Sequence, residues 1–403
     1  MRRLACAIIL ILPFLVMGCG GGYSSGSNQV PKPSFQNRAF VSNQFSGTLD
    51  IVDASTDTLG AHRVVTDPGA QVMSMSPDRT ITLVAANSAG SNRIDAISNA
   101  TETVLGSLSL PDESISFFYL PDNKIVYAAV RNTGQVFRWD TSVSSGVTNV
   151  AVPNALRMVR SSDGKSILVF PDDTSNTVYH INTTTTPPTV TPVTGFDRPV
   201  WAVFSSDNSM AWVLNCGPEC GGATAGVQVL NLPALTLGAS LAVPGGATYA
   251  LLNGSTLYVA GTPPSTACTL TPTVNCGFVS KVNASATPTL GVSKEIADGY
   301  HDHMVLASNG KLFIGAAAQC AAVAPNGCLS IYNTANDAVT IVPPCGSPCN
   351  SLSDITGMTA IPGRTVVYVI EGGELRIYDA TTDALQSKQV DTVGRSWDVV
   401  APD

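Results

Sequence analysis

One pattern recurs along the whole chain, and it constrains the fold more than any other feature of the sequence. In each copy, alternating apolar residues lead into an Asp or Asn and then a Thr/Ser-rich segment, as in residues 49–59 (LDIVDASTDTL). Alternation predicts a β-strand, and Asp or Asn followed by Thr or Ser predicts a tight turn. The copies follow one another at intervals of 42 to 52 residues and centre on Asp53, Ser98, Asp140, Asn182, Asn231, Asn283, Asn333 and Asp379.

A second element precedes each copy: an apolar run, a turn such as Ser76-Pro77-Asp78, and another apolar run. Each repeat therefore contains four short strands, which we name a, b, c and d in chain order. Four-stranded units of this length are the blades of β-propellers. The sequence predicts an all-β fold, a single propeller of eight four-stranded blades over residues 38–403. Seven blades are the alternative, because the copies around Asn231, Asn283 and Asn333 diverge most.

The two ends of the repeat array complete each other. The first repeat begins near residue 38 with strands b, c and d, and residues 396–403 supply a strand a with nothing after it. Pairing the C-terminal strand a with the N-terminal strands b–d would close the ring and remove its free sheet edges.

Residues 76–87 (SPDRTITLVAAN) and 97–101 (ISNAT) resemble the YVTN-type propeller repeat. The resemblance implies the propeller fold over nearly all of the chain. Proteins with such repeats include surface and S-layer proteins, adhesion modules and lactonases, so the resemblance does not fix an activity.

The N-terminus has the pattern of an export signal. Arg2 and Arg3 precede an apolar stretch over residues 4–18, which predicts a signal peptide over residues 1–18. Residues 15–19 (LVMGC) resemble a bacterial lipobox, which implies a lipoprotein lipidated at Cys19, with residues 19–37 as lipidated cysteine and flexible tether. No Asp follows Cys19, and the resemblance then implies the outer membrane, with the protein periplasmic or surface-exposed in the cell envelope. An ordinary secretory signal is the alternative.

Composition excludes several classes of protein. A net charge of -8 and a pI near 4.9 disfavour nucleic-acid binding. A hydrophobic content of 44% disfavours disorder. No apolar run reaches the roughly 18 residues of a membrane span, which excludes a polytopic membrane protein. We expect a monomer that meets the membrane through its lipid anchor.

Eight cysteines follow Cys19, and an even number in an exported protein predicts disulfides. The short spacings favour bridges between nearest neighbours, and zinc binding at the two closely spaced pairs is the rival interpretation. The predicted bridges are Cys216–Cys220, Cys268–Cys276, Cys320–Cys328 and Cys345–Cys349. All four lie in b–c loops or d–a links, which share one face of a propeller.

The strands a begin on that same face, beside the central channel. Counting back from each turn places Val72, Ser116, Arg157, Trp201, His303 and Trp397 in one ring. His301 is two residues from His303, so both side chains should face the same way along a strand. The candidate binding residues of the channel mouth are Arg157, Trp201, His301, His303 and Trp397.

No nucleophile, phosphate-loop, dinucleotide or zinc-protease motif is present, and no catalytic residue can be assigned. We therefore predict a non-enzymatic binding or scaffold protein, without cofactor or metal, that engages a protein or glycan of the envelope through its disulfide-bearing face. The alternative is a hydrolase, lactonase-like or metal-dependent, with its site at the channel mouth.

Overall fold

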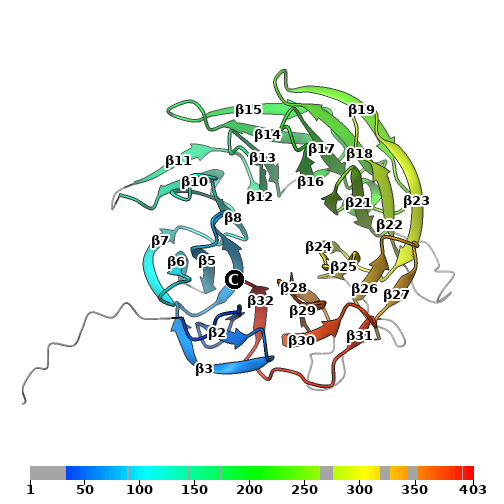
Figure 1. The fold of residues 1–403 in the computed structure, drawn as a ribbon. Helices are drawn as coiled ribbons and strands as arrows, with labels where there is room; N and C mark the ends of the chain where they lie inside the picture. The colour runs from blue at the N-terminus through cyan, green and yellow to red at the C-terminus, as the bar shows by residue number, and fades with distance from the viewer. Residues whose placement is uncertain are drawn as a thin grey trace, which may run out of the picture.

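The computed structural model describes residues 33–88, 90–143, 146–172, 174–263, 276–317, 327–343, 353–392 and 394–403. Within them, strands β1 to β32 form eight antiparallel four-stranded sheets arranged in a ring (Figure 1). The predicted eight-bladed β-propeller is confirmed, and the seven-bladed alternative is wrong. The predicted signal peptide, Cys19 and most of the predicted tether lie outside the described residues. No helix in the described part of the chain is long and apolar enough to cross a membrane.

Each blade runs from an inner strand a at the channel to an outer strand d. Blade 1 joins β32 (Ser396–Val400) to β1 (Arg38–Asn43), β2 (Thr48–Asp53) and β3 (Thr58–Val65). Blades 2 to 4 are formed by β4 (Ala70–Met75), β5 (Ile81–Ser88), β6 (Ser91–Ser98) and β7 (Thr103–Leu110); β8 (Ser116–Tyr119), β9 (Ile125–Val130), β10 (Gln135–Asp140) and β11 (Val147–Ala151); β12 (Ala155–Arg160), β13 (Ser166–Pro171), β14 (Thr177–Asn182) and β15 (Thr189–Thr194).

The other half of the ring repeats this arrangement. Blades 5 and 6 are formed by β16 (Pro199–Phe204), β17 (Met210–Asn215), β18 (Gly226–Asn231) and β19 (Thr236–Ala242); β20 (Tyr249–Asn253), β21 (Thr256–Gly261), β22 (Gly277–Asn283) and β23 (Thr289–Ile296). Blades 7 and 8 are formed by β24 (His301–Leu306), β25 (Lys311–Ala316), β26 (Leu329–Asn333) and β27 (Val339–Ile341); β28 (Ile355–Ala360), β29 (Val366–Glu371), β30 (Glu374–Asp379) and β31 (Ala384–Leu385).

The hydrophobic core lies between the blades. Strands b are mostly buried, and β9 and β29 are buried along their whole length, because both faces of a strand b pack against a neighbouring sheet. The outer strands face solvent, and four of the five residues of β11 are exposed. Eight apolar clusters each join two neighbouring blades, so the ring is held together by its full set of blade interfaces.

The regularly spaced Asp residues serve the turns. In the a–b turn of blade 2, Asp78 Oδ1 accepts hydrogen bonds from Ser76 Oγ at 2.7 Å and from the Thr80 backbone at 3.1 Å. In a c–d turn, Asp53 Oδ1 accepts from the Ser55 backbone at 2.9 Å. These side chains mimic backbone turn bonds, which is why the repeat requires Asp, Asn and Ser there.

The predicted ring closure is present. Strand β32 pairs with β1, with Phe40 opposite Val400 and Val41 opposite Val399. On the side of the ring where β1 begins, the Arg38 guanidinium donates to both oxygens of Asp403, at 2.7 and 2.6 Å. The side chain of Arg79 donates to the Asp403 carbonyl at 3.0 Å. The two chain ends therefore form one blade, the seam of the ring.

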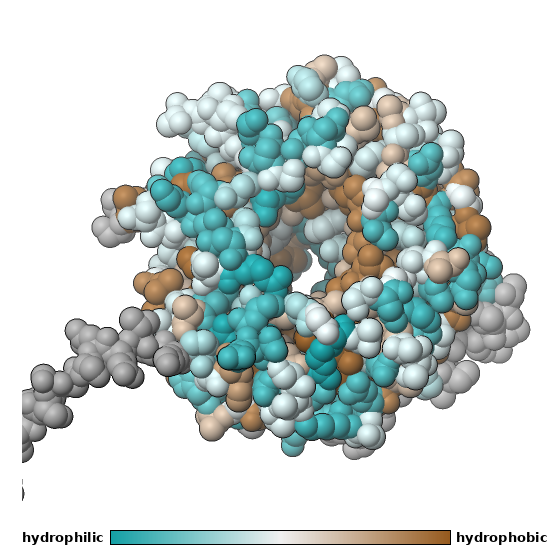
Figure 2. Space-filling model, viewed as in Figure 1, coloured by the Kyte–Doolittle hydropathy of each residue, from teal (hydrophilic) through white to brown (hydrophobic). Residues whose placement is uncertain are grey.

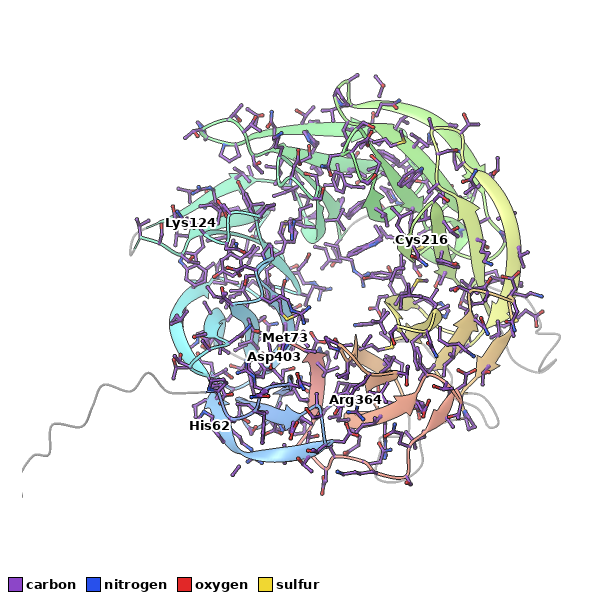
Figure 3. All side chains as sticks on the ribbon, viewed as in Figure 1. His62, Met73, Lys124, Cys216, Arg364 and Asp403 are labelled. Carbon is purple, nitrogen blue, oxygen red and sulfur yellow. A yellow bond between two sulfur atoms is a disulfide. The ribbon has the colours of Figure 1, made fainter. Side chains whose placement is uncertain are left out.

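The same side of the ring carries ion pairs between neighbouring blades. In each pair a cation of one blade binds a carboxylate in the c–d turn of the next, and the acidic residue has a positive φ of 53 to 60°. The pairs are Arg38–Glu102, Lys281–Asp337, Lys311–Asp383 and Arg364–Asp57 (Figure 3 labels Arg364).

We call this side, with the a–b and c–d turns, the turn face; it includes residues 53–58 and 76–80. The opposite side, with the b–c loops and d–a links, is the mouth face; it includes residues 196–198, 217–222 and 298–300. The disulfide between Cys216 and Cys220 lies in a b–c loop of the mouth face.

Candidate functional site

A cavity of about 520 Å³ lies at the centre of the ring. The space-filling view shows an open channel there, with apolar residues along part of its wall (Figure 2). Residues near the beginning of all eight inner strands line it, and Met73 of β4 is labelled at its edge in Figure 3. The lining residues that matter for its chemistry are Arg157, Trp201, Tyr249, Asp302, His303, Thr356 and Trp397.

All six residues of the predicted ring lie at the cavity. Val72, Ser116, Arg157, Trp201, His303 and Trp397 all line the cavity. Counting back from the turns therefore locates the channel positions of six blades.

His301 is an exception, and the prediction that it faces the channel with His303 is wrong. Its side chain is fully buried away from the cavity, and a Cβ on Gly277 would lie 2.5 Å from its imidazole ring. Burial lowers the pKa of His301 to about 4, so this imidazole is neutral. His301 is a packing residue.

A β-bulge causes the difference. The pairing of β24 with β25 shifts register between His301 and His303, and similar shifts occur in the inner strands β4, β12, β16, β28 and β32. A bulge redirects the side chains that follow it. Consecutive residues such as Asp302 and His303 consequently both line the cavity.

A chain of charged groups spans the cavity. Arg157 of β12 donates from Nη2 to Asp302 Oδ2 of β24 at 3.3 Å, although their blades are not neighbours. The other oxygen, Asp302 Oδ1, lies 2.6 Å from His303 Nδ1. Burial favours a higher pKa for Asp302, but His303 and Arg157 outweigh it and lower that pKa. Asp302 is therefore ionised between two cationic partners.

Asp398 is a functional candidate that the repeat pattern did not indicate. Its Oδ2 accepts from the Met73 backbone at 2.7 Å and its Oδ1 from the Val399 backbone at 2.7 Å. Gly357 packs closely against it, since a Cβ there would lie 2.4 Å from Asp398 Oδ1. Burial raises the pKa of Asp398 to about 6.

Two carboxylates act on His303. Burial by itself would lower the pKa of this imidazole, but the charges of Asp302 and Asp398 outweigh burial and Arg157 and raise it. Within the described residues, nothing hydrogen-bonds to His303 Nε2. The geometry therefore favours an imidazolium, and His303 is one of the residues that line the cavity.

Aromatic rings form a further part of the wall and its surroundings. Trp201 and Tyr249 stack with ring centroids 4.7 Å apart. Arg157 lies over the ring of Tyr300 at 5.3 Å, and Arg395 lies over Trp397 at 5.2 Å. Trp201 also packs against the cores on both sides of blade 5, as expected for a residue between blades.

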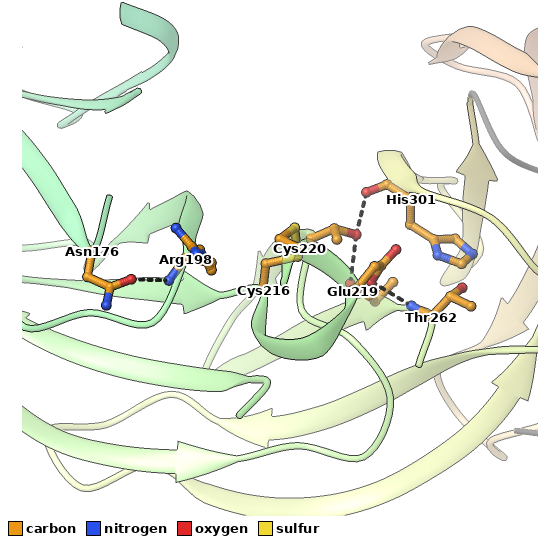
Figure 4. The surroundings of a disulfide bond; sticks show 9 residues. Asn176, Arg198, Cys216, Glu219, Cys220, Thr262 and His301 are labelled. Atoms are coloured by element: carbon orange, nitrogen blue, oxygen red, sulfur yellow. Dashed lines mark hydrogen bonds between the residues drawn. A yellow bond between two sulfur atoms is a disulfide. The ribbon is translucent and has the colours of Figure 1, made fainter. Parts of the chain in front are cut away.

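The disulfide-bridged loop carries an acidic residue toward this mouth. The short 3₁₀ turn η1 (Gly217–Cys220) holds Glu219 so that its Oε2 accepts from the Thr262 backbone of the next blade at 2.9 Å (Figure 4). Burial raises the pKa of Glu219 to about 7, and Asp298 adds to the effect. Cys276 and Cys328 are also disulfide-bonded. Their predicted partners, Cys268 and Cys320, and the pair Cys345 and Cys349 lie outside the described residues.

The raised pKa of Glu219 predicts a pH-dependent stability. The folded state holds a proton on Glu219 up to about pH 7, whereas an unfolded chain loses it near pH 4.5, so this group destabilises the fold as pH rises between them. Glu219→Gln keeps the acceptor for Thr262 and should raise the free energy of unfolding by about 2 kcal/mol at pH 8, with little change at pH 4. Urea unfolding at both pH values measures this.

The control is Glu113→Gln, which alters a half-exposed carboxylate in the link between β7 and β8. It should leave the pH dependence of unfolding as it is in the unaltered protein. An equal gain for Glu219→Gln at both pH values would contradict the titration of Glu219.

The described part of the chain holds no cluster of three or more His, Cys, Asp or Glu side chains arranged to bind a metal ion. The open groups of the cavity are instead hydrogen-bond donors. Arg157 gives Asp302 one of its five N–H groups, and nothing among the described residues hydrogen-bonds to His303 Nε2. The arrangement can bind a ligand that accepts hydrogen bonds.

The sequence matches no protein-family model and no curated protein sequence. Solved structures do match the fold. Dihydro-heme d1 dehydrogenase NirN in complex with DHE has 13% identity and a TM-score of 0.65, over 92% of this chain and 77% of that one. Hydrazine synthase of Kuenenia stuttgartiensis has 14% identity and a TM-score of 0.57, over 83% and 98%. The β-propeller domain of Cps50 (Swd1) of Myceliophteria thermophila has 8% identity and a TM-score of 0.54, over 75% and 92%. At these identities the likeness concerns architecture, and the chain is a β-propeller.

Proposed function

We propose that this chain is a lipid-anchored protein of the cell envelope that binds a protein or glycan partner at its mouth face, without catalysis. One observation carries the proposal: the mouth face combines a concave channel entrance with a loop that a disulfide holds in place beside it. Loops fixed on a rigid scaffold are typical binding surfaces, because little ordering entropy is lost on binding.

The position of the N-terminus supports this orientation. Strand β1 begins on the turn face, where Ser34 donates to Glu102 at 2.6 Å and Arg38 contacts Asp403. A tether that precedes residue 33 therefore joins the ring on the side opposite the mouth face. An anchored molecule can then direct its mouth face away from the membrane.

Cross-linking in the envelope tests the binding surface. A photoreactive amino acid at position 223, an exposed site beside the disulfide, should form one specific adduct with a partner protein or glycan. The same group at position 165, an exposed site on the turn face, should not form that adduct. Replacing both Cys216 and Cys220 with Ser should weaken the adduct. Equal cross-linking from both faces would count against the proposal.

Fractionation of cells tests the anchor separately. Replacing residues 1–19 with an ordinary cleavable secretory signal should move the protein from the membrane fraction to the soluble fraction of the envelope, since the acyl chains supply the membrane affinity. A variant that stays in the membrane fraction would contradict lipidation at Cys19.

A hydrolase is the second candidate, and the Asp302–His303 pair is the observation that favours it. A carboxylate that orients an imidazole beside a cavity is a common arrangement for proton transfer. The raised pKa of His303 argues against a general base, because an imidazolium cannot accept a proton. Hydrolysis in a panel of lactones that disappears in His303→Asn would establish the enzyme, and no turnover by the unaltered protein would exclude it for that panel.

A further inference from the structure

We propose that the channel cavity is a separate small-molecule site that takes a compact organic acid: the carboxylate lies against Arg157 and His303, and an apolar body lies against the aromatic wall. The aromatic wall consists of Phe117, Phe118, Trp201, Tyr249 and Trp397. This inference goes beyond the partner surface proposed above, since it concerns the interior of the ring.

Asp302 lines the cavity, Asp398 lies behind the lining, and both carboxylates are already hydrogen-bonded within the protein. Asp302 uses Oδ1 for His303 and Oδ2 for Arg157. Asp398 uses Oδ1 for the Val399 backbone and Oδ2 for the Met73 backbone. Each of the four oxygens thus already has a donor within the protein, which weakens its attraction for a cationic ligand.

The hydrogen-bond donors of the cavity, in contrast, are not all used by the protein. Arg157 makes a single hydrogen bond of 3.3 Å to Asp302 within the described residues, and a guanidinium can hold a second carboxylate with its remaining N–H groups. His303 also belongs to the lining, and nothing within the described residues hydrogen-bonds to its Nε2. Guanidinium and imidazolium groups beside each other favour an anion, and their planar N–H groups suit a carboxylate.

The other residues of the lining determine which kind of group can accompany the carboxylate in the ligand. Most of the other lining residues are apolar or aromatic, among them Met73, Met158 and Ala317. A sugar would leave most of its hydroxyl groups without partners there, at a cost for each buried one. A cavity of about 520 Å³ is within the usual size of small-molecule sites, which are largely apolar with a few fixed polar groups.

Calorimetry with matched probes tests the proposal on the full-length protein. The probes are phenylacetate, 3-phenylpropanoate and 2-naphthoate, each paired with its neutral amide. At pH 6 at least one acid should bind tenfold or more tightly than its amide, because charge-assisted hydrogen bonds to the carboxylate are lost in the amide. Arg157→Gln should remove this preference, and Arg131→Gln, which alters an arginine paired with Glu113 and Asp172 outside the cavity, should keep it.

A pH series on the unaltered protein tests the same point without a substitution. The groups that face His303 are Asp302 on its own strand, Asp398 on β32 and Arg157 on β12. They leave an imidazolium at pH 6 that loses its proton at higher pH, while the probe stays ionised. The affinity for the acid should therefore fall several-fold between pH 6 and pH 9, and the affinity for the amide should not change.

Three results would overturn the proposal: acid and amide bind equally, no acid in the panel binds, or the affinity for the acid does not depend on pH. None of these three results bears on the proposed partner surface, which is tested by cross-linking at position 223. Conversely, if the cross-linked adduct is absent but the acid still binds, the partner surface is refuted and the channel site is supported.

Discussion

Arg38→Ala should lower the free energy of unfolding by about 3 to 5 kcal/mol, the usual effect of leaving a buried charge without its partner. The Arg38 side chain is only 4% exposed, and it lies 3.0 Å from Glu102, which is 2% exposed. It also holds Asp403 at the end of the chain. The substitution would therefore leave a buried carboxylate and release the C-terminal residues from the seam. Urea unfolding followed by tryptophan fluorescence measures the loss.

Arg131→Ala is the control for this experiment. Arg131 makes ion pairs of 2.6 and 3.0 Å with Glu113 and Asp172, but its side chain is 42% exposed. Exposed pairs contribute less than about 1 kcal/mol. If the two variants lose the same stability, the Arg38 contacts do not hold the seam, and pairing of β32 with β1 alone closes the ring.

Arg364→Ala should lower the free energy of unfolding by about 2 to 3 kcal/mol at pH 7, and by less at pH 3. Arg364 donates to both oxygens of Asp57, at 2.5 and 2.9 Å, across the interface between blades 8 and 1. Tyr368 donates its hydroxyl to the same carboxylate. Burial favours a higher pKa for Asp57, but these donors outweigh it and lower the pKa.

The sign of the pH dependence follows from that lowered pKa. The folded state holds Asp57 ionised to lower pH than an unfolded chain, whose carboxyl titrates near 3.8. The stabilisation is complete above the unfolded pKa and disappears as the pH falls through the folded one. The difference between the unaltered protein and Arg364→Ala should therefore shrink from pH 7 to pH 3.

Lys124→Ala is the matched control for Arg364→Ala. Lys124 lies in the a–b turn of blade 3, as Arg364 does in blade 8 (Figure 3), but it is exposed and has no ion pair within the described residues. Its removal should change the free energy of unfolding by less than about 0.5 kcal/mol at either pH. A constant difference for Arg364→Ala across the pH range would refute the role assigned to Asp57.

The fold could be predicted from the sequence because its information is local. Each blade repeats the same turn chemistry, in which residues such as Asp78 and Asp53 bind backbone groups two residues away. The spacing of these turns predicts the number of strands. Residues 396–403 form a strand a that is not followed by strands b, c and d, and this predicts that the ring closes by pairing with the first repeat. The hydrophobic interfaces then follow from the requirement that each sheet cover the next.

The site could be predicted only in part, because its chemistry depends on distant neighbours. Counting from the turns placed Arg157 and His303 at the cavity. Alternation failed at His301, since a bulge has no signature in the residue pattern of a strand. Asp398 is 325 residues from Met73, whose backbone it binds, and Glu219 reaches Thr262 in another blade. No spacing within one repeat reveals such contacts.

The seam also sets the order in which the protein can mature. The contact between Arg38 and Asp403 links positions 365 residues apart. Blade 1 therefore cannot be completed before β32 has been synthesised. Until then blades 1 and 8 expose the apolar residues that later form their common interface. Contacts between such distant positions form late and slowly in folding. The ring therefore cannot close until β32 (Ser396–Val400) is available to pair with β1.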